Sequence, residues 1–240
     1  ASWVDFLTKT TNFTRDRTSN HNDLDATGTP TEVAGQIGTA FNFDGASEYF
    51  SAALTALTNE GITLTCLLNS DDVTANQNLI GLGNNGATGH FRQMLVGSGG
   101  IRAQKQNDAG TVSQADTSNT PTNSTWGHAA NVYTSDTDRA SWFDMVTGSK
   151  GADATSVSDP TVDFIAFGAL LRSSVAQYFD GSLEHVRAAS SAFSENRLIT
   201  EKNNLMSPGT FITAGTPAPI GGATILPMLS NYNHMNGGTL

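Results

Sequence analysis

The sequence predicts an all-β protein, a sandwich of two antiparallel sheets followed by one short helix and an extended arm. Three observations support this fold class. Only 14% of the residues are charged and glycine occurs 24 times, a composition typical of many short strands joined by tight turns. Apolar and polar residues alternate in short runs, which is the period of half-buried strands. A chain of 240 residues is long enough for one large undivided sandwich.

Residues 126–144 have the pattern of a β-hairpin, and the rest of the prediction is built on it. Apolar and polar side chains alternate along Trp126–Tyr133. The segment Thr134–Asp138 contains only Ser, Thr and Asp, which satisfy their own backbone in turns. Ala140–Phe143 then resumes the apolar run. We expect two adjacent strands here, with one face toward a core.

This hairpin and two further segments, Gly35–Gly45 (GQIGTAFNFDG) and Phe179–Arg187 (FDGSLEHVR), carry a resemblance to a known family. In this order they resemble the LamG-like domains of the concanavalin A-like lectin/glucanase superfamily, of the type found in phage structural proteins. The resemblance covers residues 16–208 and implies a jelly-roll sandwich. We expect this domain over residues 1–206 and the arm over residues 207–240. Asp144 is followed by Met145 where the family has glycine, so we expect a longer turn there.

Apolar or alternating runs place the other elements. They predict strands or strand-rich segments over residues 1–15, 39–45, 48–57, 62–68, 78–83, 90–96, 101–115, 163–171 and 179–190. A helix is expected after Ser194, which can cap it, with Leu198, Ile199 and Leu205 on its apolar side and Pro208 at its end. The predicted core contains Phe41, Phe43, Leu64, Cys66, Trp126, Ala130, Val132, Phe164, Phe167, Leu183 and Val186.

Charge and cysteine content limit the classes of partner. The net charge of −10 and the lack of a Lys/Arg cluster exclude nucleic acid as a partner. No run approaches the ~20 apolar residues of a membrane-spanning helix, so we expect no membrane span. Cys66 is the single cysteine and lies on an alternating apolar face, where a small buried side chain is expected rather than a nucleophile.

The polar segment 16–30 raises the question of a metal. Asp16, Asp23 and Asp25 could supply oxygen ligands to Ca²⁺, which takes six to eight of them. Their spacing matches no EF-hand, and Asn/Asp-rich turns are common without metal. Calcium is therefore an alternative, and no other cofactor is expected.

The sequence contains none of the catalytic motifs considered, which predicts that the protein is not an enzyme. The superfamily includes glucanases with a Glu-x-Asp-x-x-Glu strand, and that triplet does not occur in the sequence. The five histidines are scattered, and structural roles are expected for His128 and His185. Lectin-like glycan binding is implied by the resemblance instead. Two loops supply the candidate glycan-binding residues, which are Asp71, Asp72, Asn84, Asn85 and His90.

Residues 207–240 differ from the rest of the chain. They contain no Asp, Glu, Lys or Arg, yet carry many apolar side chains, whereas disordered tails are usually charged and poor in apolar residues. We expect an arm that docks on another subunit or a capsid-like surface through Phe211, Ile212, Ile225, Leu226 and Tyr232. An arm that folds back on its own sandwich is the alternative.

Two functions follow from these patterns. The first is a virion surface protein, a capsid decoration or fibre subunit that assembles as an oligomer through the arm. The second is a glycan-binding adhesion module, which would be extracellular.

Overall fold

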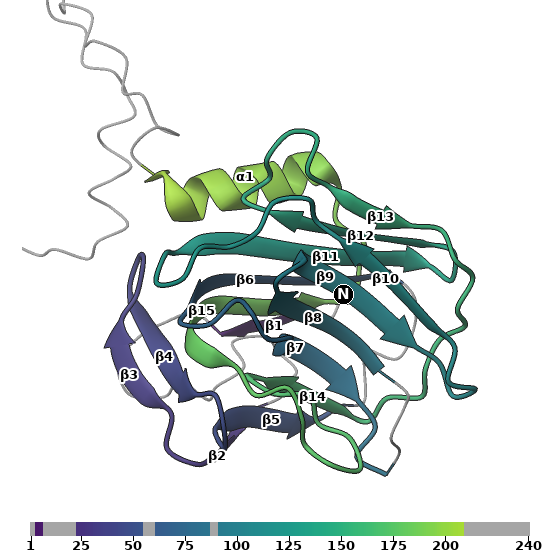
Figure 1. The fold of residues 1–240 in the computed structure, drawn as a ribbon, viewed down its shortest axis with the longest axis horizontal. Helices are drawn as coiled ribbons and strands as arrows, with labels where there is room; N and C mark the ends of the chain where they lie inside the picture. The colour runs from purple at the N-terminus through teal and green to yellow at the C-terminus, as the bar shows by residue number, and fades with distance from the viewer. Residues whose placement is uncertain (1–2, 7–22, 55–60, 87–90, 209–240) are drawn as a thin grey trace, which may run out of the picture. The chain divides into compact units, whose positions relative to one another are not determined.

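The computed structural model describes residues 3–6, 23–54, 61–86 and 91–208. Within these ranges the chain forms the strands β1–β15 and the helix α1 (Figure 1). All the strand pairs in this part of the chain are antiparallel. The all-β two-sheet prediction is therefore confirmed.

The strands form two sheets, which we call the back sheet and the front sheet. In spatial order the back sheet contains β13 (Gly151–Asp153), β12 (Asp138–Phe143), β11 (Gly127–Ser135), β6 (Ile62–Ser70), β15 (Asp180–Ala189), β4 (Thr39–Asp44) and β3 (Thr31–Ala34), and β1 (Trp3–Phe6) pairs with β15. The front sheet contains β10 (Val112–Asp116), β9 (Gly100–Gln106), β8 (Phe91–Gly97), β7 (Gln77–Gly83), β14 (Phe164–Phe167), β5 (Tyr49–Ala53) and β2 (Asp25–Thr27).

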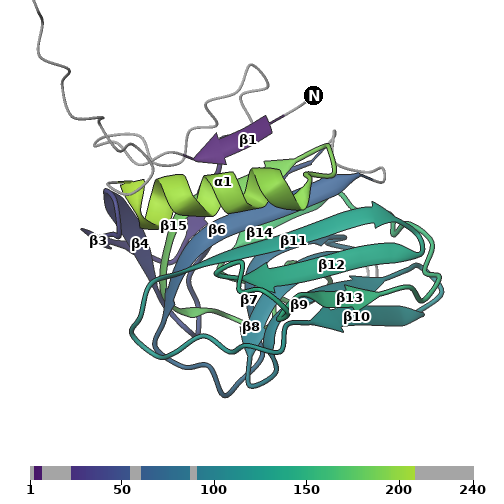
Figure 2. The same cartoon turned by 90° about the horizontal axis from the view of Figure 1, so that it is seen from above.

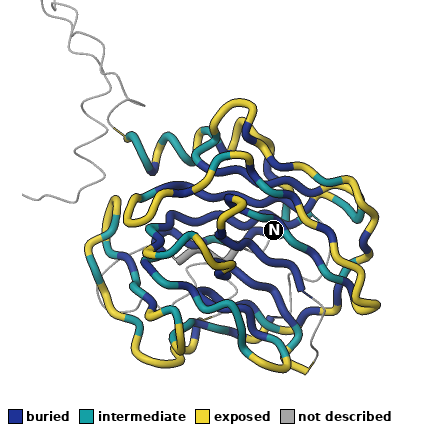
Figure 3. The backbone as a smooth tube through the Cα atoms, in the orientation of Figure 1, coloured by how far each residue is buried: buried dark blue, intermediate teal, exposed yellow. Residues whose placement is uncertain are grey.

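The main core lies between these two sheets. In Figure 3 the strands are mostly buried, whereas the exposed residues gather in the loops around them. Six of the predicted core residues belong to this cluster, namely Phe43, Leu64, Cys66, Phe167, Leu183 and Val186. Burial raises the pKa of the Cys66 thiol, with a smaller effect from Glu201, so this side chain is the buried apolar group that the sequence predicted.

The helix α1 (Glu195–Met206) covers the outer surface of the back sheet, on the side away from the front sheet (Figure 2). The Ser194 side chain caps it by accepting from the Arg197 N–H at 3.4 Å, as predicted. Leu198 is buried in a second cluster between the helix and the sheet. The back sheet thus has apolar side chains on both of its faces.

This second cluster corrects part of the predicted core. Ala130 and Val132 are buried, but they pack in the cluster under α1. Their neighbours Ala129 and Tyr133 are the residues of β11 that belong to the main core. The predicted face was therefore off by one residue, which in a strand moves every side chain to the opposite face. Three other predicted core residues are only partly buried, namely Phe41, Trp126 and Phe164.

The apolar run 163–171 is a strand only as far as Phe167. Gly168 takes a positive φ of 82°, and the chain then turns into a hairpin closed by a bridge between Leu170 and Ala176. This segment, which we call the cover hairpin (residues 168–177), lies against the outer side of β7. A Cβ added to Gly83 would come within 2.0 Å of the Leu171 carbonyl oxygen. The predicted long buried strand is thus a short strand plus a segment that packs on the sheet surface.

The turn after β12 is longer than a two-residue turn. This was predicted because Asp144 is followed by Met145, where the family has glycine. Asp144 and Met145 both have a φ of 51°, and the chain pairs again only at Gly151. The Asp144 carboxylate accepts from the His128 backbone N–H at 2.8 Å. This contact fixes the turn against the first residues of β11.

Candidate functional site

One end of the sandwich gathers side chains from four separate segments. The Phe179 carbonyl accepts from the Gly45 N–H at 3.0 Å, and the Asp180 carbonyl accepts from the Asp71 N–H at 3.0 Å. The Ser124 hydroxyl reaches Asp71 Oδ1 at 3.3 Å. We call the exposed and half-buried group at this end the tyrosine–aspartate rim, which consists of Asp44, Tyr49, Asp71, Asp72, Tyr178 and Asp180.

Two tyrosine rings form the apolar part of the rim. The ring centroids of Tyr49 and Tyr178 are 6.3 Å apart, and the ring planes are tilted by 51°. Both side chains are only half-buried. Burial raises the pKa of the Tyr178 hydroxyl, and the nearby Tyr49 and Asp44 raise it further, so this group stays neutral. The pair presents ring faces together with hydroxyl groups.

Carboxylates on the rim are held by local hydrogen bonds. The Ser47 hydroxyl and the backbone N–H groups of Ser47 and Ala46 lower the pKa of Asp44 to about 2. Asp72 Oδ1 accepts from the N–H and the hydroxyl of Thr74, which lowers the pKa of Asp72. Both carboxylates are therefore ionised and fixed in orientation before any ligand arrives.

The surroundings of Asp180 disfavour the ionised form of its carboxyl group. Burial raises its pKa, and the negative charges of Asp71, Asp72 and Asp44 raise it further. Its backbone makes two hydrogen bonds. The Asp180 N–H donates to Gln77 Oε1 at 3.1 Å, and the Asp180 carbonyl accepts from the Asp71 N–H. The rim thus concentrates negative charge and hydrogen-bond acceptors beside two aromatic rings.

The structure separates the two loops that supplied the candidate glycan-binding residues. Asp71 and Asp72 lie on the rim, directly after β6. Asn84 and Asn85 follow β7 at the far end of that strand, where Asn84 Nδ2 donates to the Thr161 carbonyl at 3.2 Å and the Asn85 N–H donates to Asp163. Seven residues of strand separate the loops, roughly 20 Å. His90 lies outside the described residues.

Sequence reasoning missed the two tyrosines of the rim. They lie at the ends of strands that are far apart in sequence, and neither belongs to the loops that were considered. The available signal was the position of Tyr178 just before the FDG segment at the start of β15. Tyr49 similarly follows the Asp44-Gly45 turn.

A second polar cluster lies between α1 and the back sheet. Glu201 accepts from the Thr65 hydroxyl at 2.7 Å and pairs with Arg187 Nη1 at 3.0 Å. The Nε2 of His128, which is fully buried, lies 3.7 Å from Glu201 Oε1. Burial would raise the pKa of Glu201, but His128, Arg187 and Thr65 outweigh it and lower the pKa to about 2. This cluster holds the helix to the sheet.

We expect Glu201→Gln to lower the free energy of unfolding by about 3 kcal/mol at pH 7. Because the pKa of Glu201 in the folded protein lies below its ordinary value of 4.5, the contribution is complete above about pH 4.5 and is lost as the pH falls toward 2. Urea unfolding from pH 7 to pH 2.5 should show the gap between wild type and variant closing. The exposed Glu195→Gln on the same helix is the control and should change stability by less than about 1 kcal/mol. A gap that stays constant on acidification would contradict the assignment.

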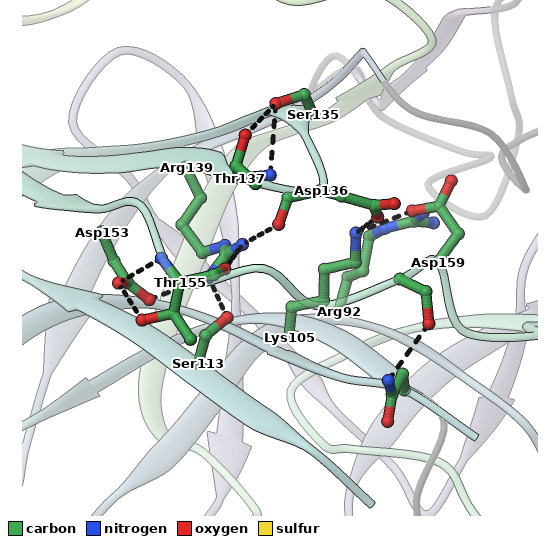
Figure 4. A network of polar contacts seen from close by, with 12 residues as sticks. Arg92, Lys105, Ser113, Ser135, Asp136, Thr137, Arg139, Asp153, Thr155 and Asp159 are labelled. Atoms are coloured by element: carbon green, nitrogen blue, oxygen red, sulfur yellow. Dashed lines mark hydrogen bonds and ion pairs between the residues drawn. The ribbon is translucent and has the colours of Figure 1, made fainter. Parts of the chain in front are cut away.

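A third cluster of charges is buried at the opposite end of the sandwich (Figure 4). Arg92, Lys105 and Arg139 are fully buried on strands of both sheets. Lys105 Nζ lies 2.8 Å from Asp136 and 2.9 Å from Asp159, and Arg92 also pairs with Asp159. The counter-charges come from three places, namely Asp136 in the turn between β11 and β12, Asp153 on β13, and Asp159 in the segment after β13. Every cation has a carboxylate partner, so we assign this cluster to stability.

The remaining predicted site residues lie elsewhere. Asp16 is outside the described residues, as are the docking residues Phe211, Ile212, Ile225, Leu226 and Tyr232. Asp23 is exposed, as is Asp25 on the short strand β2.

In the part of the chain that the structure describes, no group of three or more His, Cys, Asp or Glu side chains is arranged to hold a metal ion. The only helix among these residues is too short and polar to cross a membrane.

Comparison with known proteins identifies the family. The family model described as the concanavalin A-like lectin/glucanases superfamily matches residues 44–198. That range contains every residue of the tyrosine–aspartate rim. No curated protein sequence matches the chain.

Among the solved structures with a similar fold are two toxin binding domains and one domain of an enzyme. Domain 4 of AbnA, an extracellular arabinanase from Geobacillus stearothermophilus solved with arabinotriose, superposes with a TM-score of 0.64 at 14% identity, over 78% of this chain and 91% of that chain. The binding domain of botulinum neurotoxin DC, solved with rat synaptotagmin II, gives a TM-score of 0.63 at 9% identity, over 85% of this chain and 51% of that one. The binding domain of Paraclostridial Mosquitocidal Protein 1 gives 0.61 at 12% identity, over 79% and 49%. The chain thus spans about half the length of the toxin domains.

Proposed function

Since the chain belongs to the concanavalin A-like lectin/glucanases superfamily, we propose that it is a non-enzymatic module that binds glycans through the tyrosine–aspartate rim. The pair of half-buried rings Tyr49 and Tyr178 carries this proposal. Ring faces pack against the apolar faces of sugar rings, while a few fixed polar groups orient the ligand. The rim supplies both, because its carboxylates stand beside the rings and are held in place.

The fold neighbours support this choice of ligand class. Among the similar structures, the arabinanase domain was solved with a bound trisaccharide. The neurotoxin binding domain was solved with rat synaptotagmin II. The half-buried tyrosine rings with surrounding acceptors favour a sugar here.

A glycan array with the purified full chain tests the proposal. We expect a competable signal for neutral oligosaccharides, because the carboxylates of the rim repel acidic sugars. The same glycans incubated with the protein should release no reducing ends. A protein that binds no glycan on the array, or that cleaves one, would refute the proposed function.

The uncharged segment 207–240 favours a second candidate, a subunit of a virion surface. A run of 34 residues without Asp, Glu, Lys or Arg but with several large apolar side chains is suited to docking on another protein. Such docking should be nearly insensitive to ionic strength, since no charge in the segment can be screened. The two roles are compatible, because the rim belongs to the sandwich.

Truncation after Ser207 tests the second candidate. If the arm mediates assembly, light scattering should show a smaller oligomer for the truncated chain, whose melting temperature should be nearly unchanged. A truncated protein that keeps its oligomeric state but melts much lower would show that the arm stabilises its own sandwich. In that case the assembly role is wrong.

A further inference from the structure

The turn that follows β7 contains an Asn-Gly pair, the dipeptide in which an asparagine most readily loses its side-chain amide. The pair occurs twice in the sequence, as Asn85-Gly86 and as Asn236-Gly237, and the second lies outside the described residues. Asn85 and Gly86 are both exposed and form the turn itself. Glycine has no side chain to shield its backbone nitrogen. Among the described residues, this turn is therefore the place where an asparagine is best exposed to reaction with the backbone that follows it.

The two reacting groups are held to different extents. Neither atom of the Asn85 side-chain amide hydrogen-bonds to a described residue, so its Cγ is free to rotate toward the Gly86 nitrogen. The Gly86 N–H, in contrast, donates to Asn84 Oδ1 at 2.9 Å. The nitrogen becomes a nucleophile only after it loses this proton. The bond to Asn84 therefore slows the reaction but does not prevent it.

Three hydrogen bonds fasten the turn to the segment that leads into β14. Asn84 Nδ2 donates to the Thr161 carbonyl at 3.2 Å, and the Asn85 N–H donates to Asp163 Oδ1 at 3.0 Å. In return, the Asp163 N–H donates to the Gly83 carbonyl at 2.9 Å. The Asp163 carboxylate thus lies against the backbone of Asn85. A carboxylate formed from the Asn85 side chain would place a second negative charge beside it, and like charges repel.

We propose that Asn85 is a self-modifying site, where the asparagine converts slowly to aspartate and isoaspartate and thereby unfastens the turn from residues 161–163. A base takes the proton of the Gly86 nitrogen, which forms a bond to Cγ of Asn85. The bond from Cγ to Nδ2 breaks, and the amide leaves as ammonia. Water then opens the cyclic imide, giving aspartate by attack at Cγ and isoaspartate by attack at the backbone carbonyl. One water is consumed and one ammonia is released, with no oxidation.

Both products change the turn. Each adds one negative charge to a chain whose net charge is already −10. In isoaspartate the backbone also contains one more carbon, which moves the Gly86 nitrogen away from Asn84 Oδ1. The tyrosine–aspartate rim lies at the other end of β7, where Gln77 accepts from Asp180. The inference is therefore independent of glycan binding.

The test is ageing of the purified full chain at pH 8 in water labelled with heavy oxygen, followed by peptide mapping with mass spectrometry. Only amides lost during ageing acquire the label, and mapping separates Asn85 from Asn236. We expect the label at residue 85, together with an isoaspartyl linkage that a protein isoaspartyl methyltransferase modifies. The exposed Asn123 is the internal comparison. It precedes Ser124, and its Oδ1 accepts from the Val73 N–H at 3.1 Å, so it should convert at least tenfold more slowly.

Three variants test the atoms involved. Gly86→Ala is the matched control, because an added Cβ would lie 3.4 Å from Asn84 Oδ1, an ordinary contact. Its methyl group hinders the attack, so conversion at Asn85 should slow at least tenfold. Asn84→Ala should speed it severalfold, since the Gly86 N–H loses its acceptor. In Asn85→Asp, which carries the charge of the product from the start, hydrogen exchange at the Asp163 N–H should be severalfold faster than in wild type.

Each of these results has an opposite that overturns part of the proposal. If Asn85 keeps its amide for as long as Asn123 does, or if Gly86→Ala converts as fast as wild type, the site is wrong. An unchanged rate in Asn84→Ala would overturn the restraining role of the Gly86 N–H bond. Equal exchange at Asp163 in wild type and Asn85→Asp would show that the turn stays fastened after conversion.

Discussion

Replacing Arg139 by alanine is expected to lower the free energy of unfolding by about 3–5 kcal/mol. The guanidinium is fully buried and donates to four acceptors on different segments. These are the Ser113 hydroxyl, Asp153 Oδ2 at 2.8 Å, the Asp136 carbonyl at 2.6 Å and the Thr155 carbonyl at 2.8 Å (Figure 4). Alanine would leave a carboxylate and two carbonyls without their donor, and unpaired buried polar groups are costly.

Arg139→Lys and Arg102→Ala are the controls for this prediction. Lysine keeps the charge but lacks the planar fork that reaches several acceptors, so an intermediate loss is expected. Arg102 forms a partly exposed pair with Asp116, and its removal should cost about 1 kcal/mol or less. Urea unfolding monitored by tryptophan fluorescence measures all three. A loss below about 1 kcal/mol for Arg139→Ala would show that the end cluster does not hold the sandwich together.

Replacing Gly181 by alanine should destabilise the protein by more than about 3 kcal/mol. Gly181 has a φ of 134°, which residues with a side chain rarely adopt. An added Cβ would come within 2.3 Å of the Asn69 carbonyl oxygen and 2.9 Å of the Ser70 Cα, so β15 and β6 would have to separate. The shift would also move the adjacent Asp180, and with it the Asp71 loop of the rim.

Gly148→Ala is the matched control for Gly181→Ala. Gly148 also has a positive φ, 78°, but its added Cβ meets nothing within 4 Å. Its replacement should therefore cost only the backbone strain, about 1 kcal/mol. Thermal and urea unfolding of both variants separate the two contributions. Equal losses would mean that the close approach of β15 to β6 does not matter for stability.

Elements with a strong local pattern could be predicted from the sequence. The strand β6 was recognised because Ile62, Leu64, Cys66 and Leu68 alternate, and all four belong to the main core. The helix α1 was placed by its capping serine. The face of β11 was assigned wrongly because the strand is buried on both sides, between the main core and α1. In such a strand both sets of side chains are mostly apolar or small. The alternation then no longer distinguishes the face toward the main core from the opposite face.

The candidate site could be predicted only in part. Asp71 and Asp72 were found because a polar turn follows a clear strand, and the structure places them on the rim. The rings that complete the rim come from Tyr49, which begins β5 of the front sheet, and Tyr178, which precedes β15 of the back sheet, so they meet only when the two sheets pack together. Long-range packing of this kind leaves no local signal. The buried Arg92 and Lys105 were missed for the same reason, since their partners Asp136 and Asp159 lie on distant segments.

Calorimetry on Tyr178 variants measures whether the rings of the tyrosine–aspartate rim bind sugar. The titrant is the neutral oligosaccharide that gives the strongest array signal. Tyr178→Ala should weaken binding at least tenfold, about 1.4 kcal/mol, while Tyr178→Phe, which keeps the ring, should retain most of the affinity. The exposed Val146→Ala, in the turn after β12 and not a member of the rim, should bind as wild type. If Tyr178→Ala binds the oligosaccharide as tightly as the wild-type protein, the rim is not the glycan site.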